Sequence, residues 1–264
     1  MRGFNGEGPS DTRGRIRALT LRGIDVSPLQ AMSPEIERVE GDLCDLQSLS
    51  KAVQGVETIF HLAGVVHAKN TQGFLDLNTY GTRNLLEAAE RAGVRRLIHI
   101  SSNSVGGHTR EPRLMRETDP PRPYRQYGRS KFLAEQAVRE VAQRGKLETV
   151  ILRPCWYYGP YQAARQTRFF RMIKAGNPII FGDGTNLRSM SYLDNVIEAM
   201  LLAAQKPQAS GRTYWIADAK PYPTFEIYET IADLLEVKNF RPRRLPGLTS
   251  ELCRLADWGL QKLG

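Results

Sequence analysis

Short apolar runs alternate with longer amphipathic stretches between residues 15 and 154 of this 264-residue chain. In parallel β-sheets a helix carries the chain from the end of one strand to the start of the next, so this alternation predicts a parallel sheet. Because such crossovers are right-handed, the expected fold is an α/β doubly wound sheet with helices on both faces. The expected strands are residues 15–21, 35–39, 58–62, 97–101 and 149–152, and the expected helices are residues 46–53, 74–92 and 124–144.

The pattern loosens after residue 154, where turns and further helical stretches replace the regular alternation. The helices expected there are residues 165–175, 195–204 and 224–235. We therefore expect an irregular segment over residues 1–14, a core domain over residues 15–154, and a smaller lobe over residues 155–264 that is interleaved with the core. The chain is long enough for a core with an added lobe.

In the predicted helix 124–144, Tyr127 and Lys131 lie four residues apart, so their side chains fall on one face, one turn from each other. An ammonium beside a phenol favours the phenolate, and we expect Lys131 to lower the pKa of Tyr127. Such a hydroxyl can exchange a proton with a substrate alcohol or ketone while a hydride moves. The same pair also occurs by chance on helix surfaces, so its meaning depends on the surrounding motifs.

Five further motifs accompany this pair in a fixed order. They are residues 56–64 (VETIFHLAG), 78–89, 97–107, 152–160 (LRPCWYYGP) and 181–196. In this order they make the chain resemble the extended short-chain dehydrogenase/reductase family, which includes NAD-dependent epimerases and dehydratases of nucleotide sugars and 3β-hydroxysteroid dehydrogenase-like enzymes. The resemblance covers roughly residues 15 to 235 and implies a Rossmann-like fold that binds NAD or NADP.

The resemblance implies a role for each residue of the central motif. Tyr127 would be the general acid and base, and Lys131 would lower its pKa and hydrogen-bond the nicotinamide ribose. Ser102 would hold the substrate oxygen. An ordinary strand-end serine is the alternative for Ser102, and Ser101 and Ser104 compete for the role. The spacing to Tyr127 and the Val-x-Gly sequence that follows favour Ser102.

Asn78 matches the family's asparagine that supports the active-site strand and a proton-relay water, and its alternative is a helix cap. Asp42 would accept a hydrogen bond from the adenine amine, or else be a turn aspartate. Residues 62–64 would line the dinucleotide with backbone, since small side chains permit close approach. Pro154 and Cys155 would lie near the nicotinamide, or else form a rigid turn. The implied cofactor contacts are Asp42, Leu43, Leu62, Ala63, Gly64, Tyr127, Lys131, Pro154 and Cys155.

The residues leave the choice of cofactor and substrate open. An acidic residue after the second strand favours NAD, but here Asp25 comes late, and Arg22 could pair with the 2′-phosphate of NADP. Arg188 matches the arginine that clamps the substrate diphosphate in sugar-nucleotide members, which predicts a nucleotide sugar as substrate. The aromatic run 156–158 would also suit a flat hydrophobic substrate such as a steroid-like alcohol.

The start of the chain lacks a feature that the resemblance leads us to expect. No strand-like run precedes Gly3, residues 3–6 (GFNG) look like the tail of the family's glycine-rich turn, and the following residues favour an irregular segment. The missing strand is central in this fold, so its loss should expose neighbouring strand edges and remove the cradle for the dinucleotide pyrophosphate. A truncated or non-catalytic family member is therefore the alternative to an active enzyme.

Composition narrows the remaining possibilities. An apolar content of 41% is ordinary for a soluble protein, and no apolar stretch approaches the roughly 20 residues that cross a bilayer. Three scattered cysteines and four scattered histidines indicate no disulfide framework and no metal site, which fits a cytoplasmic protein. The net charge of +9 is dispersed, which favours anionic small molecules over nucleic acid. By resemblance, helices 74–92 and 124–144 would pair with a second copy in a homodimer.

Overall fold

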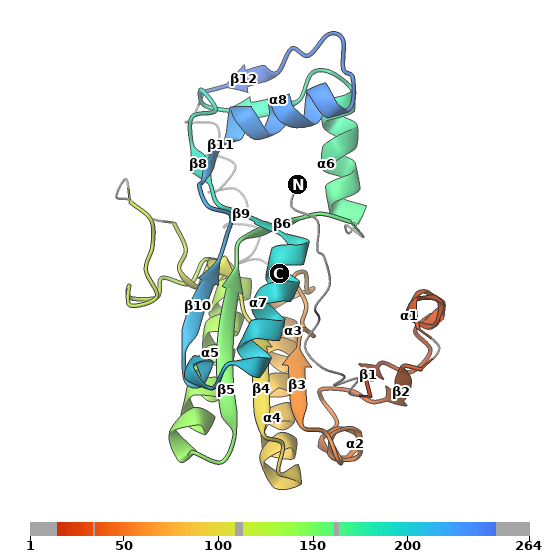
Figure 1. The fold of residues 1–264 in the computed structure, drawn as a ribbon. Coiled ribbons are helices and arrows are strands. Elements are labelled where there is room, and N and C mark those ends of the chain that lie inside the picture. The colour runs from red at the N-terminus through yellow and green to blue at the C-terminus, as the bar shows by residue number, and fades with distance from the viewer. Residues whose placement is uncertain (1–14, 34, 109–112, 161–163, 247–264) are drawn as a thin grey trace.

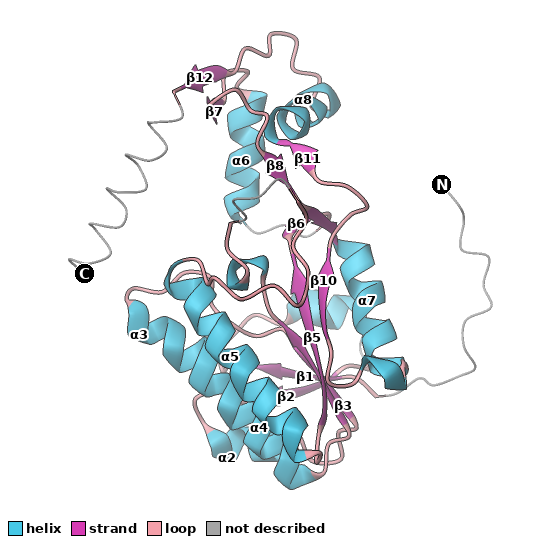
Figure 2. Ribbon diagram, turned by 90° about the vertical axis from the view of Figure 1, so that its left-hand side faces the viewer, coloured by secondary structure: helices cyan, strands magenta, loops and turns pink. Residues whose placement is uncertain are grey.

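A computed structural model describes residues 15–33, 35–108, 113–160 and 164–246 of the chain. Its centre is a four-stranded parallel sheet (Figure 1). The strand order is β10 (Thr213–Ile216), β5 (Glu148–Pro154), β4 (Arg96–Ile100) and β3 (Thr58–His61). Figure 2 shows α4 (Gly81–Ala92) and α5 (Arg125–Arg144) on one side of this sheet and α7 (Leu193–Gln205) on the other. The expected parallel α/β sheet with helices on both faces is confirmed.

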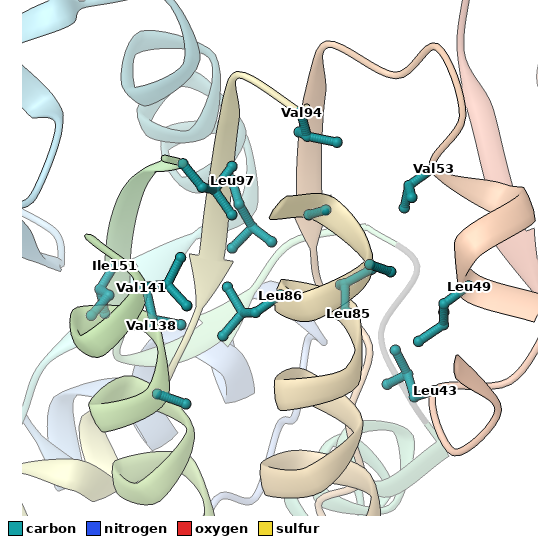
Figure 3. Close-up of a cluster of buried hydrophobic side chains, with 14 residues drawn as sticks. Leu43, Leu49, Val53, Leu85, Leu86, Val94, Leu97, Val138, Val141 and Ile151 are labelled. Atoms are coloured by element: carbon teal, nitrogen blue, oxygen red, sulfur yellow. The ribbon is translucent and has the colours of Figure 1, made fainter. Parts of the chain in front are cut away.

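Alternate residues of the central strands point into two separate hydrophobic cores. In β4, Leu97 packs with residues of α4 and α5, whereas Ile98 and Ile100 pack with residues of α7. Ile151 and Leu152 of β5 divide between the two cores in the same way. Figure 3 shows the first of these cores between the strands and the two long helices. The strands are continuous apolar runs because side chains on both of their faces are buried.

A second, two-stranded parallel sheet consists of β1 (Arg17–Thr20) and β2 (Glu37–Glu40). Within the described residues it does not pair with β3, which is the edge strand of the larger sheet. Leu19 of β1 and Ile59 of β3 nevertheless pack against the same core cluster, so the two sheets share one helical layer. Ile16 and Leu62, beside these two strands, are 63% and 61% exposed. In the described part of the chain β3 is paired on its β4 side alone, and the expected exposure of its other edge stays a prediction.

The helices near the start of the chain differ in part from the sequence prediction. Helix α2 (Leu46–Ala52) lies where expected and packs on α4. The short helix α1 (Ser27–Met32) was not predicted, because none of its residues is buried and it carries no amphipathic pattern. The helix predicted over residues 74–92 is continuous from α3 (Thr71–Phe74) into α4 but contains a π-helical segment, η1 (Leu75–Tyr80).

The smaller lobe lies at one end of the core (Figure 1). It contains helices α6 (Ala164–Lys174) and α8 (Thr224–Leu234), whereas the short helix η3 (Pro207–Ala209) follows α7 and packs on the core through Ala209. Its strand pairs are β6 (Trp156–Tyr158) with β9 (Met190–Tyr192), β7 (Ile179–Phe181) with β12 (Arg243–Leu245), and β8 (Leu187–Arg188) with β11 (Tyr222–Pro223). None of these short strands was predicted, and neither was β10, which returns to the core sheet and pairs with β5.

Candidate active site

The carboxyl ends of parallel strands β3, β4 and β5 lie at one edge of the sheet, and α5 faces this edge. Ser102 follows β4 and caps the short helix η2 (Asn103–Val105), where its Oγ accepts a hydrogen bond from the Ser104 N–H over 3.2 Å. The Ser102 hydroxyl pairs with Ser104 Oγ over 2.6 Å, and its hydrogen-bonding interaction with Tyr127 opposes the rise that burial causes in the pKa of that phenol. Ser101 instead donates to Glu135 over 2.7 Å. The structure therefore places Ser102, rather than Ser101, against Tyr127.

A glycine lets the first turn of α5 approach this serine segment. The Tyr124 N–H donates to the Ser104 carbonyl oxygen over 2.8 Å. A Cβ added at Gly128 would lie 2.5 Å from the same carbonyl oxygen, which no side chain can do without moving the backbone. Gly128 is a residue that sequence reasoning missed, although a glycine inside a predicted helix often has a packing reason.

The protonation of Tyr127 differs from the expectation. Burial raises the pKa of its phenol above 10.0, and the hydrogen bond with Ser102 opposes this shift. The expected lowering by Lys131 is not found; the Lys131 ammonium instead donates to the carbonyl oxygen of Ile100 over 2.6 Å. The free protein therefore holds Tyr127 as a neutral phenol at neutral pH.

Lys131 lies one helical turn beyond Tyr127 and is only 4% exposed. Burial lowers the pKa of its ammonium from 10.5 to about 8, and the Glu135 carboxylate opposes this shift. Lys131 is therefore a buried cation whose charge is sensitive to small changes around it.

Asn78 joins the segment after β3 to helix α5. Its Nδ2 donates to the Val65 carbonyl oxygen and to Ser130 Oγ, both over 2.9 Å, and its Oδ1 accepts from the Val65 N–H over 2.8 Å. The alternative of a helix cap is wrong, because Asn78 lies inside the π-helical segment η1. Such segments frequently occur at functional sites, since they redirect one side chain out of the regular helical ladder.

The segment after β3 comes close to the candidate catalytic side chains. Leu62, Ala63 and Gly64 are exposed there. A Cβ added at Gly64 would lie 2.8 Å from Asn78 Oδ1 and 4.0 Å from Lys131 Nζ. This glycine therefore leaves open backbone beside Lys131, which is the property that close approach of a bound ligand requires.

The residues predicted to contact the adenine end have structural partners of their own. Asp42 Oδ1 accepts a hydrogen bond from the Cys44 N–H over 2.8 Å, which is the turn geometry of the alternative interpretation. Leu43 belongs to the hydrophobic core and is 6% exposed, so only its backbone is open to a ligand. Both residues follow β2 in the separate small sheet.

Pro154 and Cys155 end β5 on the nicotinamide side of the predicted site. Pro154 is buried, and the Cys155 N–H lies within hydrogen-bonding distance of Ser191 Oγ (2.8 Å) and of the Ile216 carbonyl oxygen (3.2 Å). Burial raises the pKa of the Cys155 thiol to about 11. The thiol is therefore a packing group at neutral pH and not a nucleophile.

Arg188 lies in the smaller lobe, among aromatic side chains. Its Nε donates to Thr224 Oγ1 over 3.1 Å, and its guanidinium lies over the Trp156 ring, 5.3 Å from the centroid. Phe169 lies between Trp156 and Tyr228, tilted against the first ring and edge-to-face with the second, with centroid distances of 5.5 and 5.1 Å. The surface around Arg188 thus combines a positive charge with the aromatic rings of Trp156, Phe169 and Tyr228, which we call the aromatic wall.

The described residues show neither a metal site nor a membrane span. They contain no group of three or more His, Cys, Asp or Glu side chains that could hold a metal ion. None of the helices in the described ranges is long and apolar enough to cross a membrane. The candidate glycine-rich turn at residues 3–6 lies outside the described residues.

The comparisons with known proteins agree with this geometry. A sequence model described as the NAD dependent epimerase/dehydratase family matches residues 10–217. The protein y4nL of Sinorhizobium fredii is 42% identical over 260 residues, which is 95% of this chain and 72% of that protein. A 3 beta-hydroxysteroid dehydrogenase/Delta 5-->4-isomerase of Mycobacterium tuberculosis is 30% identical over 237 residues, 81% of this chain and 62% of that enzyme.

A solved structure adds the spatial match. The dTDP-glucose 4,6-dehydratase DesIV of Streptomyces venezuelae, crystallised with NAD bound, superposes with a TM-score of 0.74 at 27% identity. The match covers 84% of this chain and 70% of that one. The chain thus belongs to the NAD dependent epimerase/dehydratase family and spans 62 to 72% of the lengths of these three proteins.

The residues around Lys131 fit the nicotinamide end of the family's cofactor. Gly64 leaves an open backbone position that a Cβ would fill, beside a buried ammonium and a neutral phenol. Tyr127, Lys131 and Gly64 would hold the nicotinamide ribose, and the nicotinamide ring attached to it would accept or supply the hydride. The described residues hold no glycine-rich turn between a first strand and a helix, which is where this fold binds the pyrophosphate.

Proposed function

We propose that this protein uses NAD or NADP to move a hydride at a secondary alcohol or ketone carbon, as an epimerase, dehydratase or oxidoreductase. The observation that carries the proposal is the convergence of Ser102, Tyr127 and Lys131, with the phenol hydrogen-bonded to the serine and the buried ammonium one turn away. This set provides a proton donor, a second hydrogen bond to the same substrate oxygen, and a fixed positive charge.

The protein groups supply the proton chemistry of this reaction. In the reducing direction, the neutral Tyr127 phenol gives its proton to the ketone oxygen as the hydride reaches the carbon. In the oxidising direction, Tyr127 must act as the phenolate to take the hydroxyl proton, a form that burial disfavours in the unliganded site. Ser102 holds the substrate oxygen in both directions, and Asn78 keeps α5 aligned with the segment after β3.

We propose a nucleotide sugar as the substrate, bound between the core of residues 15–154 and the lobe of residues 155–264. Arg188 supports this assignment because its guanidinium is exposed and suited to a diphosphate. The NAD-bound relative DesIV is named for dTDP-glucose. The second candidate, a steroid-like or other hydrophobic alcohol, is favoured by the aromatic wall of Trp156, Phe169 and Tyr228 and by the mycobacterial relative.

The first experiment combines cofactor binding with one substitution. Purified protein is titrated with NADH and with NADPH by fluorescence, and turnover is then screened on nucleotide sugars and on steroid alcohols. Tyr127→Phe should abolish turnover, because it removes the transferable proton, while changing the dissociation constant for the cofactor by less than about threefold. Turnover that survives in Tyr127→Phe would disprove the acid–base assignment. Absence of cofactor binding by the folded wild type would favour a non-catalytic family member.

We also propose a homodimer in which α4 and α5 pack against the same helices of a second copy. Family resemblance supports it, and Arg83 of α4 and Glu140 of α5 already form an exposed ion pair across the two helices, 3.4 Å apart. Sedimentation at several protein concentrations tests it directly. A monomer at all concentrations up to about 100 μM would refute this assembly.

A further inference from the structure

Helix α5 carries a fully buried carboxylate one turn beyond Lys131. Glu135 is 0% exposed, and Tyr127, Lys131 and Glu135 are spaced four residues apart along α5, so they lie along the same side of the helix. An acidic side chain is almost never buried without partners, because the loss of hydration is too costly. What Glu135 contacts therefore indicates why it is there.

Glu135 accepts four hydrogen bonds. Its Oε1 accepts from Ser101 Oγ over 2.7 Å and from Arg153 Nε over 2.8 Å. Its Oε2 accepts from Arg153 Nη2 over 2.7 Å and from Arg139 Nη2 over 2.9 Å. The paired bonds from Arg153, which is 3% exposed, fix the carboxylate in one plane. The acceptor capacity of the carboxylate is thus fully used.

These partners stand next to the residues of the candidate active site. Ser101 immediately precedes Ser102 after β4, and Arg153 immediately precedes Pro154 at the end of β5. Glu135 itself is on the helix that carries Tyr127 and Lys131. One carboxylate therefore ties together the ends of two strands and the helix, which are the three elements that bring the catalytic groups into contact.

Glu135 also faces the Lys131 ammonium and favours its charged form. The other titratable groups near Lys131 are Tyr127 on the same helix, His61 of β3 and His99 of β4, all of which burial keeps neutral. Arg139 and Arg153 are cations that already pair with Glu135. Among the described residues, Glu135 is the one acidic group that acts on Lys131.

We propose that Glu135 is a positioning residue for the proposed reaction, which sets the Ser102 segment against α5 and keeps Lys131 in its charged form. The inference rests on the proposed function for its kinetic consequences, but its effect on Lys131 is independent of turnover. A buried ion pair that only stabilises the fold would leave kcat and its pH profile unchanged in a folded variant.

The test compares Glu135→Gln with Glu140→Gln. Glutamine keeps the size of Glu135 but removes its charge, and its Nε2 can only donate, so two of the four hydrogen bonds that Glu135 accepts are lost as well. Glu140 lies on the same helix, is 52% exposed and pairs with Arg83, so it is a matched control for the same chemical change. Protein labelled with [13Cε]lysine is titrated by NMR, and Lys131→Met assigns the signal.

In Glu135→Gln, the titration midpoint of Lys131 should fall by about one pH unit or more, because loss of a nearby negative charge favours the neutral amine. The alkaline limb of the kcat profile should move with it. Glu140→Gln should leave both unchanged. A folded Glu135→Gln variant with an unchanged Lys131 midpoint would overturn the proposal, even if wild-type turnover is never detected.

A second variant separates positioning from charge and remains usable if Glu135→Gln does not fold. Ser101→Ala removes one hydrogen bond to the carboxylate and keeps all the charges. We expect a fall in kcat of about tenfold with little change in KM, and an unchanged Lys131 midpoint. Full kcat in a folded Ser101→Ala would refute positioning through this contact. If the wild type shows no turnover, that result counts against the proposed function only. The titration of Lys131 in Glu135→Gln would still test the proposed role of Glu135.

Discussion

Two buried histidines sit opposite each other in the sheet, and mild acid should therefore weaken this fold. His61 of β3 is the register partner of His99 of β4, with ring centroids 5.2 Å apart. His61 Nε2 lies 2.8 Å from Thr82 Oγ1, whereas both ring nitrogens of His99 are buried without a hydrogen-bond partner among the described residues. Burial, together with the nearby Lys131 charge, lowers the pKa of His61 from 6.5 to about 3 and that of His99 well below 6.5.

The size of the effect follows from proton binding to the unfolded chain. In the unfolded chain a histidine binds a proton with a pKa of 6.5, whereas a buried histidine in the folded protein stays neutral. Its contribution to the free energy of unfolding is therefore complete above pH 6.5. That contribution declines by about 1.4 kcal/mol for each pH unit below 6.5, until the folded pKa is reached. At pH 5 each of the two histidines therefore lowers the free energy of unfolding by about 2 kcal/mol, and the pair lowers it by about 4 kcal/mol. The total free energy of unfolding of a typical protein is about 5–15 kcal/mol.

Urea unfolding followed by circular dichroism at pH 7 and pH 5 measures this loss. Carboxylates also titrate in this range, so the informative quantity is the difference between variants. His99→Leu fits the apolar site and removes one titrating group, and it should lose about 2 kcal/mol less than the wild type between the two pH values. His67→Gln, at an exposed position, should behave like the wild type. An equal acid loss in His99→Leu and the wild type would refute the reasoning.

Two further predictions concern the alignment of α5. Gly128→Ala should destabilise the protein by about 2 kcal/mol or more and reduce any turnover, because the new Cβ would approach the Ser104 carbonyl oxygen. The control is Arg129→Ala, at an exposed position on the same helix. Equal melting temperatures for the two variants would contradict this prediction. Asn78→Ala should lower the free energy of unfolding, measured with urea, by about 2–3 kcal/mol, because the Val65 backbone loses both of its side-chain hydrogen-bond partners. A loss below about 0.5 kcal/mol would contradict this prediction.

Much of the architecture could be predicted from local patterns. The strands and the two long helices are continuous apolar runs or amphipathic stretches, and these follow from the periodicity of burial. Strand β10 escaped prediction because its sequence is short, and only its pairing with β5 shows that it belongs to the core sheet. Helix α1 and the paired strands of the lobe lack a buried face or sufficient length, so no pattern marks them.

The separation of the small β1–β2 sheet from β3 was predictable from the sequence in part, and the tertiary structure decided the rest. The missing strand pattern at the start of the chain led us to expect an unpaired strand edge, and within the described residues β3 pairs with β4 alone. That the two sheets still rest on one helical layer could not be predicted. It depends on Leu19 of β1 and Ile59 of β3, which both pack against the same core cluster.

For the candidate site, the sequence by itself determined the residue types and their spacing: Tyr127 and Lys131 one turn apart, with Ser102 at the end of a strand. Only the tertiary structure decided their environment. It placed Ser102 rather than Ser101 against the phenol, made the phenol less acidic by burial, and set Glu135 among partners from two strands. Helical spacing is a local property, whereas desolvation and charge pairing depend on what distant segments bring to the same place.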